Sequence, residues 1–450
     1  MAPTASSTET AELKQQEVSR RVAPMNDTPT TEPETSPNSV PPTTVQRWNH
    51  PRRNIVKIAA CFWSFIVMGA NDAAYGALIH YIESYYNLSY LVVSIIFLSP
   101  LVGYISSALL NNRVHEFWGQ RGVAALTAGA HILAYTLVAI HPPYPVLVVA
   151  FAIAGFGNGI GDAGWNAFIG SMESANQLLG FLHGFYGAGA VLSPLIATSM
   201  VATAGLPWYT YYYLMIGFAG LEFLSLVFSF WSSSGVAYKA SVSENDSSTG
   251  NDEKATLSAV LITRPSARVT WLCSLFLLGY VGIEVALGGW IVVFMIQVRH
   301  GSEVASGMTA TGFWLGITVG RFVLGFITPK IGEKLAISIY LLLIMGLELL
   351  FWLVPQLIVS AVAVGLQGFF LGPLFPATIV IMSRLLPRHL HVGAIGFAAA
   401  FGSSGAAILP FAVGAIAQAK GVQVLQPIIL ALLVVILGLW LGLPRIVKRD

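Results

Sequence analysis

Residues 269–297 read VTWLCSLFLLGYVGIEVALGGWIVVFMIQ. This run contains a single charged side chain, Glu284. A helix of about 20 apolar residues crosses the roughly 30 Å hydrocarbon core of a bilayer. The stretch therefore predicts a membrane-spanning helix with one acid in it.

The rest of the chain repeats this pattern. The 450 residues are 55% hydrophobic and 10% charged, whereas a soluble domain carries about 25% charged residues. We therefore exclude one large soluble enzyme and expect an all-α membrane protein. The same length criterion gives twelve spans: 55–82, 90–111, 120–141, 144–171, 178–203, 208–231, 269–297, 304–327, 334–354, 356–383, 391–419 and 424–443.

Polar segments divide these spans into two halves. Residues 1–53 are rich in Thr, Pro, Ser and Glu and predict a disordered tail without a cleavable signal peptide. Residues 232–268 predict a solvated linker between the bundles 54–231 and 269–443. Residues 444–450 form a short C-terminal tail.

The basic residues predict the orientation. With both termini in the cytosol, twenty of the 23 Lys and Arg residues fall on the cytosolic side, and the exceptions are Arg299, Lys420 and Arg321. We expect a multi-pass protein of the plasma membrane, with a vacuolar or other internal membrane as the alternative. The sequon at Asn87 would face outward, and we expect it to stay unmodified because it lies so close to the membrane.

The two halves repeat each other, as in secondary transporters. An offset of 212 residues relates Cys61, Asp72 and Gly76 to Cys273, Glu284 and Gly288. Between the fifth and eleventh spans the offset is 216, and it relates Gly180, Phe181, Phe185, Gly189 and Pro194 to Gly396, Phe397, Phe401, Gly405 and Pro410. We expect two pseudo-symmetric six-helix bundles around a central cavity.

Several motifs resemble the major facilitator superfamily, which implies its twelve-helix fold. Residues 320–325, GRFVLG, and 330–334, KIGEK, resemble the superfamily's cytosolic loop signature, whose first-half partner around Arg113 and Arg121 lacks the Asp-Arg pair. Asn71-Asp72 and residues 155–168 resemble the fucose permease type of sugar/proton symporter. Residues 179–187, LGFLHGFYG, resemble fungal facilitators of the bypass-of-stop-codon type.

Acids within the spans are candidates for proton coupling. An ionised carboxylate at the bilayer centre costs on the order of 3 kcal/mol, so it must be protonated, paired or facing water. The resemblance to fucose permease implies proton coupling by Asp72 and by Asp162, where that family has the longer Glu. By analogy with the superfamily, we expect the spans that carry Glu222 and Glu348 to sit on the outside of the bundles, with these acids reaching the membrane surface or packing locally, and Glu222→Gln to be nearly silent.

Other polar and aromatic residues are candidates for solute binding or gating. Arg321 is expected to hold a cytosolic gate with Lys330 and Gly332, by bonding helix carbonyls or an acid such as Glu333. His131 and His80 are interpreted as packing residues. The predicted cavity set, whose aromatic members would stack on a ring-shaped solute, is Asn71, Tyr75, Asn158, Trp165, Asn166, His183, Tyr186, Glu284, Trp290, Trp314 and Gln367.

These residues favour a proton-coupled transporter of a small polar organic solute, with sugars among the candidates, working by alternating access. An exporter of a secondary metabolite or drug and a non-transporting nutrient sensor are the alternatives. We expect a monomer whose partners are protons, a solute and the lipid bilayer. The chain has no Gly-x-x-x-x-Gly-Lys-Ser/Thr motif and a net charge of only +2, so we expect no ATP-driven pump, nucleic-acid partner, cofactor or metal.

Overall fold

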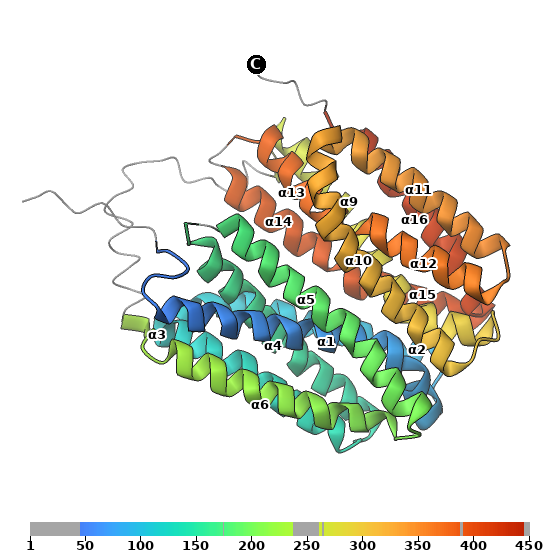
Figure 1. Cartoon of the computed structure of the whole chain (residues 1–450), viewed down its shortest axis with the longest axis horizontal. Helices are drawn as coiled ribbons and strands as arrows, with labels where there is room; N and C mark the ends of the chain where they lie inside the picture. Colours follow the sequence, from blue (N-terminus) through green and yellow to red (C-terminus); the bar gives the residue numbers. More distant parts are fainter. Residues whose placement is uncertain (1–45, 174, 237–260, 263–264, 388–389, 445–450) are drawn as a thin grey trace, which may run out of the picture. The chain divides into compact units, whose positions relative to one another are not determined.

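The computed structural model describes residues 46–173, 175–236, 261–262, 265–387 and 390–444 (Figure 1). Most of the predicted N-terminal tail, much of the predicted linker and residues 445–450 lie outside the described residues.

Five long α-helices and one short one make up the first half. Asn87, in the left-handed conformation, ends the first helix, and the Ser89 side chain caps the second by accepting from the Val92 amide at 3.4 Å. The helices are α1 (Arg53–Tyr86), α2 (Tyr90–Val93), α3 (Ile95–Ala139), α4 (Tyr144–Gly170), α5 (Ala175–Thr198) and α6 (Tyr211–Phe230).

The second half has the same plan with two interruptions. Gly332, at φ 95°, separates the second helix from the third, and Gly372-Pro373 divides the predicted tenth span. The eleventh span is divided at Ser404. The helices are α9 (Ser266–Gln297), α10 (Glu303–Ile331), α11 (Glu333–Leu353), α12 (Leu357–Leu371), α13 (Leu374–Leu385), α14 (His391–Ser403), α15 (Gly405–Lys420) and α16 (Leu425–Leu441).

Eleven helical stretches of the described residues are long and apolar enough to cross a membrane. One of them, Tyr90–Ala139, has 50 residues and would be roughly 75 Å long as a straight helix, more than two bilayer crossings require. It breaks at Gly119, whose φ of 67° and ψ of −161° are not helical. The stretch is thus two spans, which confirms twelve, although a kink at one glycine replaces the loop expected at 112–119.

Close helix crossings confirm the internal repeat. A Cβ on Gly189 would lie 2.1 Å from the Ile66 carbonyl oxygen, and a Cβ on Gly405 would lie 2.1 Å from that of Leu278. The two crossings are related by the offsets of 216 and 212 read from the sequence. Gly103 and Gly316, which are 213 residues apart, make a second matched pair. A Cβ on either glycine would lie 2.1 Å from a carbonyl oxygen of the neighbouring helix.

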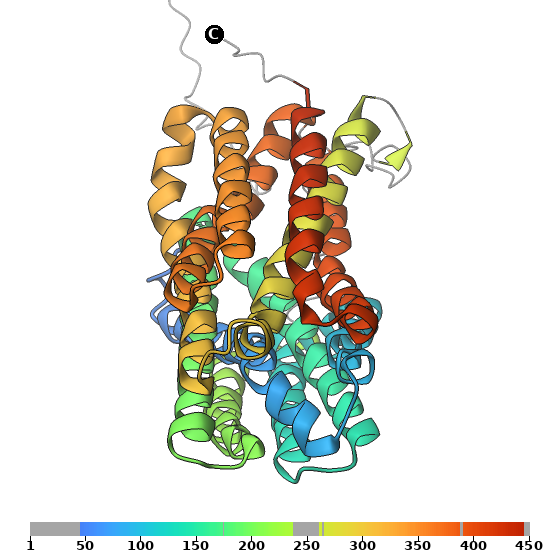
Figure 2. The same ribbon diagram turned by 90° about the vertical axis from the view of Figure 1, so that its right-hand side faces the viewer.

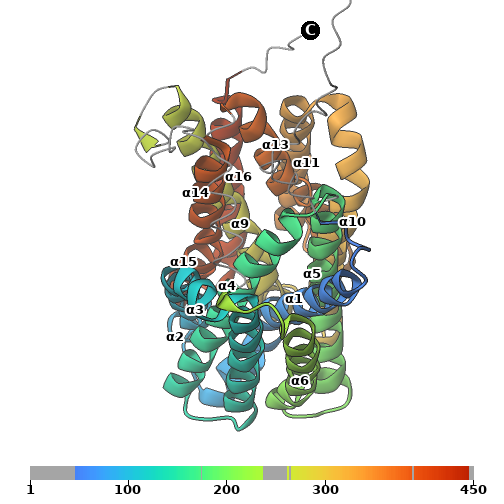
Figure 3. The same ribbon diagram turned by 90° about the vertical axis from the view of Figure 1, so that its left-hand side faces the viewer.

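The two bundles meet along a limited set of helices. α1 packs against α9, α5 against α10, and α2 and α3 against α15. Among the described residues, neither α13 nor α14 packs extensively against the first bundle. Figures 2 and 3 show α1–α6 (blue to green) on one side and α11–α16 (orange to red) on the other, with α5 and α10 at the boundary.

Candidate functional site

Asp72, on α1, is held by donors from three helices. Its Oδ1 accepts from the side-chain amides of Asn71 at 3.0 Å and Asn158 at 2.9 Å. Its Oδ2 accepts from the Tyr186 hydroxyl at 2.9 Å. The side chain is half-buried, and none of the ion pairs among the described residues includes it.

These contacts define what Asp72 can do chemically. All of its partners donate, which is the hydrogen-bond pattern of an ionised carboxylate. Both amides occupy Oδ1, and an amide nitrogen cannot accept a proton in return. Oδ2 faces only a hydroxyl, which can either donate or accept. A proton can therefore be added at Oδ2 with no more than a rotation of the Tyr186 hydroxyl.

A buried polar chain leads away from Asp72 through the first bundle. Asn158 Oδ1 lies 3.0 Å from His131 Nε2, and His131 Nδ1 lies 2.8 Å from Glu222 Oε2. The Ser64 hydroxyl donates to Glu222 Oε1 at 2.6 Å. Glu222 is fully buried and bonds α1 and α3 in the interior, so it does not reach the membrane surface from an outer span as the analogy predicts.

A second polar group lies between α4 and α5. Asn166 donates to Asp162 Oδ1 at 2.8 Å, and its own Oδ1 lies 3.2 Å from His183 Nε2. Asp162 and Asn166 are half-buried and His183 is exposed. The structure thus brings three residues of the predicted set together in a group that is only partly covered by protein.

The second bundle pairs its acids differently. Arg321 Nη2 lies 3.2 Å from Glu284 Oε1, with 26% and 9% of the two side chains exposed. The predicted partner of Arg321, Glu333, instead bonds Arg384 at 2.7 Å, so that prediction is corrected. The reason is position: Arg321 lies a full two turns before Lys330, within α10 and opposite α9. Lys330 itself is exposed near the end of α10.

Three predicted cavity residues are buried among packed side chains instead. Trp165 is fully buried and stacks on Phe230 with 4.8 Å between ring centroids. Trp290 is fully buried, and its indole donates to the Pro410 carbonyl at 2.8 Å. Gln367 is buried and donates to Glu348 at 2.8 Å. As placed, none of them is accessible to a solute, and Glu348 is interior, not peripheral.

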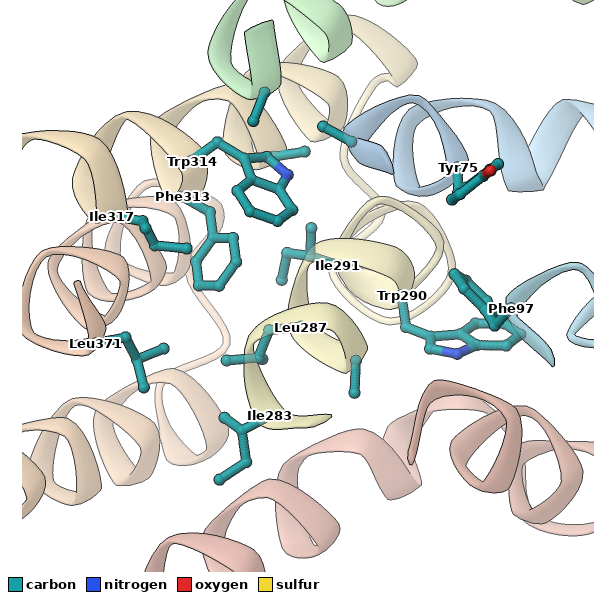
Figure 4. Close-up of a cluster of buried hydrophobic side chains, with 14 of the residues drawn as sticks. Tyr75, Phe97, Ile283, Leu287, Trp290, Ile291, Phe313, Trp314, Ile317 and Leu371 are labelled. Carbon is teal, nitrogen blue, oxygen red and sulfur yellow. The ribbon is translucent and has the colours of Figure 1, made fainter. Parts of the chain in front are cut away.

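Tyr75 and Trp314 are also nearly buried, each 5% exposed. The Tyr75 hydroxyl accepts from Asn71 at 3.0 Å and so belongs to the surroundings of Asp72. Figure 4 shows Phe97 between Tyr75 and Trp290 at the boundary between the bundles, and its ring contacts both of theirs.

The bundles touch tightly at one end. A Cβ on Gly76 would lie 1.9 Å from the Gly288 carbonyl oxygen, and Tyr81 donates to Glu303 across the boundary at 3.0 Å. Sequence reasoning missed this contact, as it missed His131 and Glu222. The signal for the latter two was a lone histidine and a lone acid in separate apolar spans, each of which needs a partner in a bilayer.

The arrangement of two repeated bundles with acids on the facing helices can be compared with known proteins. The family model for the Major Facilitator Superfamily matches residues 61–364 and 286–449. The chain belongs to the major facilitator superfamily. This membership makes it a transporter and not an enzyme, as the sequence motifs implied.

Two curated proteins align over most of the chain. Bypass of stop codon protein 6 of Saccharomyces cerevisiae is 31% identical over 416 residues, which cover 87% of this chain and 83% of the yeast protein. The glucose/mannose transporter GlcP of Bacillus subtilis is 21% identical over 392 residues, which cover 86% of this chain and 94% of the bacterial protein.

Proposed function

We propose that this transporter moves a small, polar, sugar-like solute together with protons, and that Asp72 is the group that carries the proton. The observation that supports this most directly is the set of partners around Asp72. The acid is half-buried between helices, accepts only from neutral donors, and has no ion pair among the described residues. Such a carboxylate can gain and lose a proton without breaking a salt bridge.

The proton step would be local. A proton from water binds Oδ2 of Asp72, and the Tyr186 hydroxyl turns from donor to acceptor. Because Asp72 lies on α1 and Tyr186 on α5, the step changes the bond between two helices that also contact the second bundle. Protonation and the packing of the bundles are thereby linked.

The polar group at Asp162 would meet the solute. Asn166 and His183 offer neutral donors and acceptors, which suit hydroxyl-rich solutes better than ions. The name of the Bacillus relative, a glucose/mannose transporter, supports the same class of solute. Asp162 is the candidate for a second proton-binding acid, and Glu284 with Arg321 for a contact in the opposite bundle.

Alternating access would follow from the uneven contact between bundles. They pack at Gly76 and Gly288 and are bonded through Tyr81 and Glu303, whereas α13 and α14 lack extensive contact with the described first bundle. With both termini in the cytosol, as the basic residues predict, this is the state open to the cytosol. We place the protein in the plasma membrane.

Transport by purified protein in proteoliposomes tests the proposal. An imposed gradient, acidic outside, should drive radiolabelled glucose or mannose above its equilibrium level. Asp72→Asn should abolish this accumulation but retain exchange of labelled for unlabelled hexose, because an amide keeps hydrogen-bonding capacity and cannot carry the proton. Glu348→Gln is the matched control, because Glu348 is a buried acid of the second bundle that also has an amide partner, Gln367. This variant should accumulate hexose normally.

Gradient-driven accumulation by Asp72→Asn would overturn the assignment of the proton. Failure of the unaltered protein to move either hexose would overturn the sugar-like solute. A pH-sensitive dye trapped in the vesicles reports the proton flux that accompanies any solute that is moved.

A further inference from the structure

We propose that His131 and Glu222 are positioning residues that hold Asp72 in its ionised, proton-accepting state through Asn158. This inference rests on the proposed role of Asp72. It adds a buried pair, outside the solute's reach, that tunes the pH at which the acid takes up its proton. The observation behind it is the unbroken series Ser64–Glu222–His131–Asn158–Asp72, in which each neighbour is within 3.0 Å.

The hydrogen-bond directions along this series are constrained. The Asn158 amide nitrogen donates to Asp72, so Asn158 presents its oxygen to His131 Nε2. An oxygen only accepts, and therefore Nε2 must carry a hydrogen. On the other side of the ring, Nδ1 and Glu222 Oε2 share a proton across 2.8 Å. In either position of that proton the pair is neutral as a whole, and its positive end points at Asn158.

The histidine ring has little freedom to leave this orientation. It stacks on Tyr135 with 5.6 Å between centroids and planes only 12° apart. A Cβ on Gly157 would lie 2.7 Å from His131 Cδ2, so α4 presses on the ring. His131, Glu222 and Asn158 are all at most 1% exposed. Burial this deep keeps the electrostatic interaction from being screened by solvent.

The pair would act on Asp72 in two ways. It fixes the Asn158 amide so that its nitrogen, and not its oxygen, meets Asp72. It also presents a partial positive charge to the carboxylate through that amide. Both effects favour the ionised form of an acid in a membrane interior, where an unassisted carboxylate is costly.

Other titratable groups surround the same carboxylate and must be allowed for in any test. Tyr75 lies on α1, Tyr104 on α3 and Tyr186 on α5. Asp162, one turn after Asn158 on α4, is an acid of the same bundle that interacts electrostatically with Asp72. From the second bundle, Glu284, which is paired with Arg321, interacts electrostatically with Tyr186.

Infrared difference spectroscopy of the purified protein in lipid bilayers tests the inference without a solute. The carbonyl band of a protonated carboxyl grows as the pH falls, and the part of it missing in Asp72→Asn belongs to Asp72. In Glu222→Gln and in His131→Gln, the midpoint of that band should move to higher pH. Loss of the positive end favours the protonated acid, so we expect a move of about one unit to higher pH.

The double variant makes the test specific. If Glu222 acts only through His131, then Glu222→Gln should add nothing in the His131→Gln background. Glu222→Asp, which keeps the charge, should recover part of the original midpoint. Glu348→Gln, which removes a buried acid from the other bundle, should leave it unchanged.

The outcomes separate this inference from the proposed function. No titrating band lost in Asp72→Asn would contradict the role of Asp72 itself. A band assigned to Asp72 that keeps its midpoint in both Glu222→Gln and His131→Gln would overturn only the positioning role. Equal shifts in Glu348→Gln would show a general effect of charge and would also overturn it.

Discussion

Asp72 and Glu284 occupy equivalent positions in the two bundles, 212 residues apart, but their surroundings have opposite chemistry. Asp72 is held by neutral amides and a hydroxyl. Glu284 is held by a guanidinium, that of Arg321. The same backbone arrangement therefore supports one acid with only neutral partners and one that is paired with a cation.

The repeat explains how this difference arises. With the offsets fixed by the glycine crossings, each polar neighbour of Asp72 has an apolar or small residue at the equivalent position of the second bundle. Ile283 and Leu287 appear among the buried side chains drawn in Figure 4. The pairs are Asn71 and Ile283, Tyr75 and Leu287, Asn158 and Leu371, and Tyr186 and Gly402.

The reverse holds for the cation. Arg321 on α10 corresponds, at the offset of 213, to Ala108 on α3. One substitution thus separates an acid with a cationic partner from one without. The comparison teaches that pseudo-symmetry sets where the acids lie, and the neighbours decide which of them can work as a proton carrier.

The largest effect should come from giving Asp72 the partner of Glu284. Ala108→Arg should abolish accumulation of glucose or mannose driven by a pH gradient, because a paired carboxylate stays ionised. Uptake in proteoliposomes measures this. Ala108→Gln, long and polar but uncharged, should retain accumulation, and an active arginine variant would show that the two positions are not equivalent.

Removing the cation from the second bundle should have the next largest effect. Arg321→Ala leaves Glu284 nearly buried and unpaired, which costs about 3 kcal/mol of stability. Thermal unfolding in detergent should show a lower Tm. Adding Glu284→Gln removes the unpaired charge and should recover most of the lost Tm. A double variant as unstable as the single one would contradict the pairing.

A smaller and equal effect in both bundles should follow from filling the matched crossings. Gly189→Ala and Gly405→Ala each place a Cβ 2.1 Å from a carbonyl oxygen, so the helices must separate at a cost of about 1–3 kcal/mol. Gly180→Ala and Gly396→Ala are the controls, since nothing lies within 4 Å of their Cβ positions. Unequal losses of Tm would argue against a structural repeat.

The smallest effect should come from Tyr186→Phe. It removes one donor to Asp72 Oδ2 and about 1 kcal/mol of preference for the ionised form. The pH limit of gradient-driven uptake should rise by less than one unit. No change would mean that Tyr186 does not stabilise the carboxylate, and complete loss would assign it a direct role in binding solute.

Sequence reasoning predicted the spans, the repeat and the family because these depend on local properties. The thickness of a bilayer sets the length of each apolar run, and the equal offsets of glycines and acids reveal the duplication without any contact being known. It also singled out Asp72 together with Asn71, Asn158 and Tyr186, because polar groups in a span are costly unless they have partners or face water.

The partners of those groups depended on the tertiary structure. Glu222 meets His131, 91 residues away, and Arg321 meets Glu284, 37 residues away, on helices whose relative rotation no local pattern specifies. For the same reason Trp165 is buried against Phe230 within the first bundle, and Trp290 is buried against Tyr90 and Phe97 at the boundary between the bundles. Sequence placed each side chain on its own helix; packing between helices decided which carboxylates gained a cation and which kept only neutral partners.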